Sequence, residues 1–277
     1  MFSKCLRRDG SLLSHGFEVN TVRRPSNRGI SVAEKTKSGI PGLDEALHGG
    51  FPEGAVILIS GGPGTGKSIL MNQFLIKGAA EHREPGVLVS MEESLASTIR
   101  NMKQFGWNLQ ELMDKGLLAL VDASPMIQNE RVVLKPEHPV LGREAFTMES
   151  LLSLIHREIR RVKAKRVAID SISTLTLQHK ELFRIRHDLL NMVRSLRMSN
   201  ATCLVAVESP TEESIGRFDV EGFLMDGVIS LKLTRQGTVR IRTIEIAKMR
   251  GTSHQMNPLL LIINEKGVQV SDLPPIQ

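Results

Sequence analysis

One segment, Gly61–Ser68, limits what this chain can fold into more than any other. It fits the pattern G-x-x-x-x-G-K-[ST], in which glycines let successive backbone N–H groups turn toward a phosphate. The apolar, β-branched run 55–60 precedes it and predicts a buried strand. Apolar residues and a glycine follow at helical spacing, which predicts that the segment opens a helix: Ile69, Leu70, Phe74, Leu75 and Gly78.

Individual residues of this loop are expected to bind different parts of the nucleotide and its metal ion. Lys67 is expected to reach the β- and γ-phosphates of a nucleotide, and the Ser68 hydroxyl is expected to ligate Mg²⁺. A glycine-rich turn that carries a lysine by chance is the weaker alternative, because every fixed position is filled and both flanks fit. The residues predicted to bind the nucleotide here are Gly62, Gly64, Thr65, Gly66, Lys67, Ser68 and Ile69.

Acidic residues follow two further predicted strands. Asp170 closes an apolar strand, the Walker B pattern that holds Mg²⁺ at the carboxyl edge of a sheet. Glu92 and Glu93 follow the apolar run 86–91, at the same edge, where a carboxylate can activate the attacking water. Alternatively, both acids favour the first turn of a helix capped by Ser94. Because adjacent side chains diverge, we expect Glu92 to be the direct base.

A basic segment, 248–254, closes a long predicted strand near the C-terminal end. Lys248 and Arg250 lie two residues apart, so on a strand they share one face and can clamp phosphate oxygens. A solvated strand face is the alternative interpretation of this pair.

Strand and helix segments alternate from Lys37 onward, which predicts a mainly parallel, twisted α/β sheet with helices on both faces. After Asp226 the sequence is rich in strands, and Gln236–Gly237 predicts a hairpin turn, so antiparallel strands should extend the sheet. The proline-bearing stretch 123–142 predicts a long loop. We expect residues 37–277 to form a single domain.

Residues 1–36 are predicted to form a basic, disordered or partner-dependent arm; an upstream translation start and a transit peptide are the alternatives. The net charge is +6, and residues 1–30 contribute six basic residues against two acids, or +4. The remainder is close to neutral, which gives weak support for nucleic-acid binding.

Composition predicts a reducing cytoplasm. Cys5 and Cys203 form neither a disulfide framework nor a metal-ligand cluster, and no apolar run is long enough to span a bilayer. Cys203 lies in the apolar run 202–207, which predicts a buried strand cysteine.

Several short segments, in order, resemble the KaiC-like group of RecA-type ATPases. The resemblance covers residues 37–270 and implies a single-domain member with a RecA-like P-loop fold that uses ATP and Mg²⁺. The matching segments are 38–44, 61–68, 91–94, 105–107, 121–125, 168–171, 220–223 and 248–254.

The resemblance also implies roles for individual residues. In that family the paired glutamates after the second strand are catalytic, a role that passes to Glu92 and Glu93. The segment matching 248–254 reaches the nucleotide of a neighbouring subunit, typically in a hexameric ring, so Lys248 and Arg250 would be catalytic in trans. The neighbour's nucleotide would also contact Met249, Thr252 and His254.

The chain departs from the clock proteins of this family, which have two tandem ATPase domains. Gly222 and Phe223 stand where their autophosphorylating domain has a Ser-Thr pair. The favoured function is therefore slow ATP hydrolysis by an oligomeric regulator with protein signalling partners. An autokinase or nucleotide-gated scaffold stays open. So does a DNA-associated recombination or helicase-type ATPase, for which the basic helix near 157–163 would contact phosphates.

Overall fold

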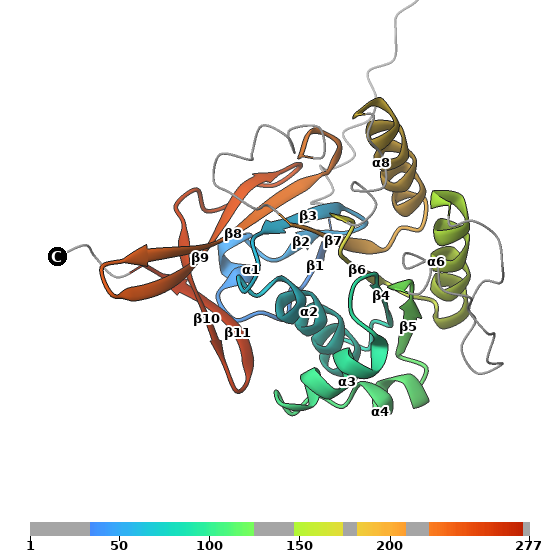
Figure 1. Ribbon diagram of the computed structural model, residues 1–277, viewed down its shortest axis with the longest axis horizontal. Coiled ribbons are helices and arrows are strands. Elements are labelled where there is room, and N and C mark those ends of the chain that lie inside the picture. Colours follow the sequence, from blue (N-terminus) through green and yellow to red (C-terminus); the bar gives the residue numbers. More distant parts are fainter. Residues whose placement is uncertain (1–33, 125–146, 174–181, 209–221, 274–277) are drawn as a thin grey trace, which may run out of the picture. The chain divides into compact units, whose positions relative to one another are not determined.

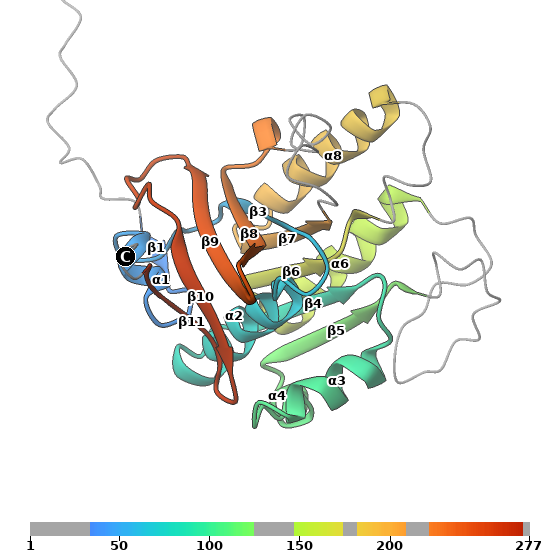
Figure 2. The ribbon, with the colours of Figure 1, turned by 60° about the vertical axis from the view of Figure 1, so that its left-hand side comes forward.

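The computed structural model describes residues 34–124, 147–173, 182–208 and 222–273. A nine-stranded sheet runs through them in the order β11-β10-β9-β8-β3-β7-β6-β4-β5, with helices on both faces (Figures 1 and 2). The six strands from β8 to β5 pair in parallel, whereas β9, β10 and β11 continue the sheet antiparallel. The predicted fold class is confirmed, including the antiparallel C-terminal extension.

The nine strands are β3 (Val56–Gly61), β4 (Gly86–Ser90), β5 (Leu118–Asp122), β6 (Arg166–Asp170), β7 (Thr202–Glu208), β8 (Gly227–Gln236), β9 (Val239–Met249), β10 (Leu259–Asn264) and β11 (Gly267–Asp272). Gln236 pairs with Val239, so β8 and β9 form the predicted hairpin around Gly237. The parallel strands bring their carboxyl ends to one edge of the sheet.

The helices are α1 (Leu43–Ala46), α2 (Lys67–Glu81), α3 (Leu95–Lys103), α4 (Leu109–Asp114), α6 (Met148–Val162) and α8 (Leu182–Arg197). The Ser94 side chain accepts a hydrogen bond from the Ser97 backbone N–H, which confirms the predicted cap of α3. Thr147 and Ser150 form a reciprocal capping box at the start of α6.

The sheet separates two hydrophobic cores, because alternate residues of each strand face opposite sides. In β3, Ile57 and Ile59 pack on the side of α2, whereas Val56 and Leu58 pack on the side of α6 and α8. Strands buried on both faces need continuous apolar runs, which is why the parallel strands lack polar alternation. Cys203 is fully buried as predicted, and burial raises the pKa of its thiol to about 12.

A buried arginine fixes α2 to the sheet. Arg166, at the start of β6, is 0% exposed, and its guanidinium lies 4.6 Å from the centroid of the Phe74 ring. It donates to the Phe74 carbonyl oxygen at 2.8 Å and to Glu84 Oε2 at 2.6 Å. Gly78 leaves it room, since a Cβ there would lie 2.2 Å from Arg166 Nε.

The described fold begins before Lys37. Lys35–Thr36 form β1, which pairs antiparallel with β2 (Phe51–Pro52), so the last two residues of the predicted arm belong to a small sheet. The partner strand lies 16 residues away, and local composition carries no sign of such a pairing. The predicted loop at 123–142 falls almost wholly outside the described residues. Within the described part of the chain, no helix combines the length and apolar character needed to cross a membrane.

Candidate nucleotide-binding site

The phosphate loop connects β3 to α2 at the carboxyl edge of the sheet, as the sequence predicts. Gly64 and Gly66 have φ angles of +75° and +106°, which favour glycine, and a Cβ on Gly66 would lie 2.7 Å from Ile263. The loop therefore opens directly onto the N-terminus of a 15-residue helix, whose free N–H groups and dipole favour an anion.

Lys67 lies over this loop and is only 8% exposed. Its Nζ donates to the carbonyl oxygens of Gly61 at 2.8 Å and Gly62 at 3.2 Å. Thr65 Oγ1 donates to the same Gly62 oxygen at 2.8 Å. The ammonium group is thus held at the loop by weakly bonded neutral acceptors, which charged phosphate oxygens can replace with stronger hydrogen bonds.

Asp170 and Ser68 come together, although they lie about a hundred positions apart in the chain. Burial raises the pKa of Asp170, and the charges of Glu92 and Glu93 act in the same direction. A hydrogen bond with the Ser68 side chain and the charge of Lys67 act against that rise. Carboxylate and hydroxyl oxygens are ligands that Mg²⁺ accepts. A nearby cation also stabilises the charged form of a desolvated carboxylate. Both residues therefore fit the predicted metal site.

The two adjacent glutamates point to different partners. Glu92 is exposed, and its Oε1 accepts a hydrogen bond from Ser171 Oγ at 2.6 Å, directly beside Asp170. The half-buried Glu93 accepts from Asn101 Nδ2 at 2.7 Å and from the Ser97 hydroxyl, both on α3. Glu92 therefore lies beside Asp170, the predicted metal ligand, whereas Glu93 ties the strand end to the following helix.

Lys248 and Arg250 lie at the opposite edge of the sheet from their own phosphate loop. Met249 pairs with Gly227, at the start of β8, whereas Gly61, at the end of β3, pairs with Leu231. The offset of four positions between Gly227 and Leu231 corresponds to about 13 Å along the strands. The structure brings neither cation to the P-loop of the same chain.

Both cations instead contact backbone carbonyls of residues 222–225, a helical turn just before β8. Lys248 Nζ donates to the Gly222 oxygen at 2.7 Å and the Met225 oxygen at 2.8 Å, and Arg250 Nη2 donates to the Phe223 oxygen at 2.9 Å. Partial burial lowers the pKa of Lys248, the nearby charge of Arg250 adds to this, and Asp226 opposes it.

The remaining residues of the basic segment lie at the same distal edge. Met249 is 6% exposed and packs in the core on the side of α2. Thr252 Oγ1 accepts from Lys35 Nζ at 2.6 Å, and His254 Nδ1 lies 3.2 Å from the Gln255 carbonyl oxygen. None of the three is brought to its own phosphate loop.

Two residues near the site were not among the sequence candidates. Ser171, which holds Glu92, directly follows Asp170, so its place in the motif was a usable signal. Arg242 Nε donates to the Gly64 carbonyl oxygen at 3.0 Å. That contact depends on how β9 lies over the loop, and no local pattern in the sequence indicates it.

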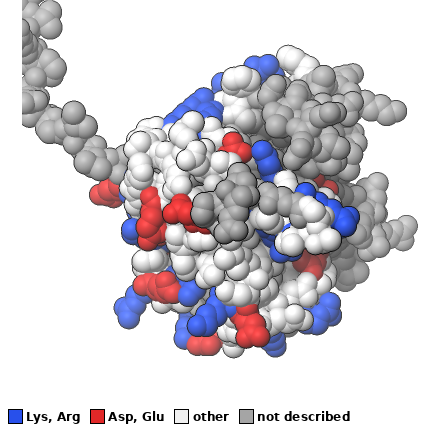
Figure 3. All heavy atoms as spheres, turned by 90° about the vertical axis from the view of Figure 1, so that its left-hand side faces the viewer, with Lys and Arg blue, Asp and Glu red and all other residues white. Residues whose placement is uncertain are grey.

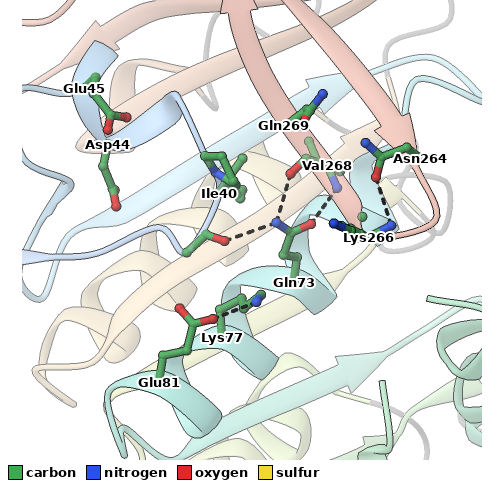
Figure 4. A pocket seen from close by; sticks show the side chains of 13 residues that line it. Ile40, Asp44, Glu45, Gln73, Lys77, Glu81, Asn264, Lys266, Val268 and Gln269 are labelled. Atoms are coloured by element: carbon green, nitrogen blue, oxygen red, sulfur yellow. Dashed lines mark hydrogen bonds and ion pairs between the residues drawn. The ribbon is translucent and has the colours of Figure 1, made fainter. Parts of the chain in front are cut away.

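A separate cavity of about 370 Å³ lies between α1, α2 and the β10–β11 turn (Figure 4). Asp44, Glu45 and Lys266 line it, together with the ion pair of Lys77 and Glu81 at 2.6 Å. None of the predicted site residues lines this cavity, so it is distinct from the phosphate loop.

Comparisons with known proteins place the chain in a family. A family model described as the ATPase KaiC matches residues 36–274. The circadian clock oscillator proteins KaiC of Parathermosynechococcus lividus and of Nostoc sp. are 36% and 37% identical to the chain over 267 and 257 residues. These alignments cover 94% and 92% of this chain but 47% of each relative, so the chain spans about half their length.

A solved structure matches as well. The crystal structure of a KaiC-like protein from the hyperthermophilic archaeon Pyrococcus horikoshii OT3 is similar with a TM-score of 0.73 and 35% identity. The match covers 86% of this chain and 99% of that one. From its phosphate loop, its sheet and these matches, the chain belongs to the KaiC family of RecA-superfamily P-loop ATPases.

Proposed function

We propose that this protein is a cytoplasmic regulatory ATPase that binds Mg-ATP and hydrolyses it slowly as a closed ring, with six subunits expected. The observation that carries the proposal is the separation of its charged groups. The phosphate loop lies at one edge of the sheet, and Lys248 and Arg250 lie at the other. Hydrolysis changes the ring's conformation and thereby its affinity for protein signalling partners.

One subunit supplies the phosphate- and metal-binding half of each site. Lys67 exchanges its carbonyl contacts for phosphate oxygens, and Ser68 and Asp170 hold the metal ion. A magnesium ion held by Ser68 and Asp170 would supply positive charge against the phosphates of the nucleotide. Glu92 orients the attacking water and accepts its proton, because it is exposed beside Asp170, whereas Glu93 is engaged by α3.

The neighbouring subunit supplies the other half. Its Lys248 and Arg250 approach the phosphates, and its Met249, Thr252 and His254 line the nucleotide. Such a contact joins two different surfaces, so it repeats around a ring until it closes. An isolated subunit lacks these cations and therefore hydrolyses poorly, since arginine-finger groups contribute about 10³–10⁵-fold to related reactions.

The test combines assembly and turnover. Light scattering should show a larger particle with Mg-ATP than without it, and ADP release should fall sharply in both Glu92→Gln and Arg250→Ala. Arg235→Ala, which removes an exposed arginine at the tip of the β8–β9 hairpin, is the matched control and should retain turnover. A particle that stays monomeric with Mg-ATP, or full turnover in both variants, would refute the proposal.

The nucleic-acid alternative gains little support from the surface. On the face in Figure 3, basic and acidic side chains are interspersed rather than gathered into one basic surface. On α6, Arg157 and Arg161 both contact Glu158, at 3.4 and 2.7 Å, so two of the helix's cations are already paired. Salt-dependent binding of single-stranded DNA by the full chain would reverse this preference.

A further inference from the structure

We propose that Asp226 positions Lys248 and Arg250 for the neighbouring subunit's nucleotide, with Arg197 as its partner. The inference rests on the proposed function, in which those two cations act in trans. Asp226 lies between the short turn 222–225 and β8, at the distal edge of the sheet, so it does not belong to its own phosphate loop.

The Asp226 carboxylate is held firmly from two sides. Arg197, the last residue of α8, donates to both oxygens: Nη2 to Oδ1 at 2.7 Å and Nε to Oδ2 at 3.1 Å. The Val56 backbone N–H, at the start of β3, also donates to Oδ2 at 3.1 Å. A bidentate pair with an additional backbone donor fixes the carboxylate in one orientation.

The two trans-acting cations are fixed through this carboxylate and the turn before it. Arg250 Nη1 lies 3.7 Å from Asp226 Oδ1, and the Arg250 backbone N–H donates to the Asp226 carbonyl oxygen at 2.8 Å. Each carbonyl of the turn 222–225 accepts from at least one of three cations, Lys248, Arg250 or Arg197, and the Phe223 carbonyl accepts from two of them. Orientation of the turn and orientation of the cations are therefore coupled.

The charge balance makes Asp226 necessary. Three cations gather around the turn, and among the described residues Asp226 is the carboxylate that contacts two of them directly. Without its charge, Lys248, Arg250 and Arg197 repel one another at close range, and each side chain gains by turning to solvent. With the Asp226 charge present, the charged groups of Lys248 and Arg250 stay at the edge, where a neighbour's polyphosphate would approach.

The first experiment replaces Asp226 by Asn, which keeps an oxygen acceptor for the Val56 N–H and removes the charge. In the full chain with Mg-ATP we expect kcat to fall by about tenfold or more, while KM changes by less than about threefold, because positioning affects the transition state most. The matched control is Glu245→Gln, which removes the acid of a 3.1 Å ion pair with Lys232 on the same two strands. The control should keep normal turnover.

The second experiment separates positioning from folding by mixing subunits. Asp226→Asn retains its own P-loop and Glu92, and Glu92→Gln retains intact cations. When the two variants assemble together, roughly a quarter of the sites pair an intact P-loop with an intact neighbour, so turnover should recover to about that fraction. A misfolded Asp226→Asn chain could not provide those sites.

A second mixture, of Arg250→Ala with Glu92→Gln, tests the trans arrangement alone. If Arg250→Ala and Glu92→Gln fail to complement, the trans arrangement is wrong and the role of Asp226 falls with it. If that pair complements but the Asp226→Asn mixture does not, the role of Asp226 alone is refuted. Normal turnover of Asp226→Asn by itself would also refute it.

Discussion

The two edges of the sheet hold their cations in different ways. At the carboxyl edge, Lys67 is buried, and its acceptors lie only five and six residues away in the chain. At the opposite edge, the Arg250 side chain is 53% exposed, and its acceptor lies 27 residues away. The first edge is built by one continuous motif, whereas the second is assembled from the ends of α8, β9 and the turn before β8.

This difference predicts that the two edges respond differently to substitutions elsewhere in the chain. A motif held by its own neighbours stays in place when the rest of the chain moves, so it suits permanent nucleotide binding. An edge held through a turn and a shared carboxylate depends on contacts between distant parts of the chain, so substitutions outside the cations themselves should disturb it. The variants below test that division, beginning with the largest expected effect.

The largest effect should come from Lys67→Ala. In the proposed mechanism the Lys67 ammonium binds the β- and γ-phosphates, so its loss should reduce ATP turnover by about 10³-fold or more. Mixing with Glu92→Gln should not restore it, because neither variant then has an intact carboxyl edge. Lys77→Ala on the same helix, whose lysine pairs with Glu81 at the surface, should retain turnover. Recovery of activity in the mixture would contradict a fixed local site.

The adjacent glutamates should differ clearly in effect. Glu92→Gln should lower kcat by about 10²-fold or more, the range for loss of a general base, whereas Glu93→Gln should cost less than about tenfold. The reason is that Glu92 faces Ser171 beside Asp170, and Glu93 is bonded to α3. Single-turnover hydrolysis, with bound nucleotide measured separately, distinguishes chemistry from binding. Equal losses in both variants would show that the two acids share the role.

Two glycines of the loop offer a finer comparison. Gly66→Ala should destabilise the fold by about 1–3 kcal/mol, through its left-handed backbone and contact with Ile263, and should weaken nucleotide binding. Gly64→Ala has a positive φ as well, but nothing lies within 4 Å of its Cβ position, so it should cost less. Urea unfolding and nucleotide titration of both variants measure the difference. A greater loss at Gly64 would contradict the packing argument.

The smallest effect should be the pH dependence of fold stability that His156 contributes, away from both edges of the sheet. His156 on α6 lies 2.6 Å from Ser195 Oγ on α8. Burial, followed by the charge of Arg160, lowers the pKa of His156 below its ordinary value of 6.5. The folded state therefore binds this proton less readily than the unfolded state, so stability is present above pH 6.5 and falls as the pH drops through the lowered pKa.

His156→Gln can keep the bond to Ser195 and should flatten this dependence. The measurement is the free energy of unfolding at several pH values between 7 and about 5, with nucleotide absent. His187→Gln, an exposed histidine on α8, is the control and should keep the original slope. An unchanged slope in His156→Gln would show that other groups carry the dependence.

The sequence predicted the carboxyl edge well because its residues are consecutive or close a strand. The strand before the P-loop, the helix after it and the cap at Ser94 all follow from local pattern. Asp170 and Glu92 could be placed at one edge because parallel strands end together. That placement needed only that the strands run parallel, which the alternation of strands and helices predicts.

The distal edge could not be predicted in the same way. Lys35 contacts Thr252 across 217 positions, and at the carboxyl edge the Arg242–Gly64 contact, across 178 positions, escaped prediction for the same reason. The Arg197–Asp226 pair joins the end of α8 to the residue before β8, 29 positions away. Such contacts depend on register and packing, which composition and periodicity do not specify.

The packing of Arg166 against Gly78 has a consequence for how this chain can evolve. The guanidinium fills the volume that a side chain at position 78 would need. The two positions therefore constrain each other's substitutions. A larger residue at position 78 fits only if the residue at position 166 is smaller, and either change made alone should lower the stability of the fold. Among homologues, the residues at positions 78 and 166 should therefore change together or not at all.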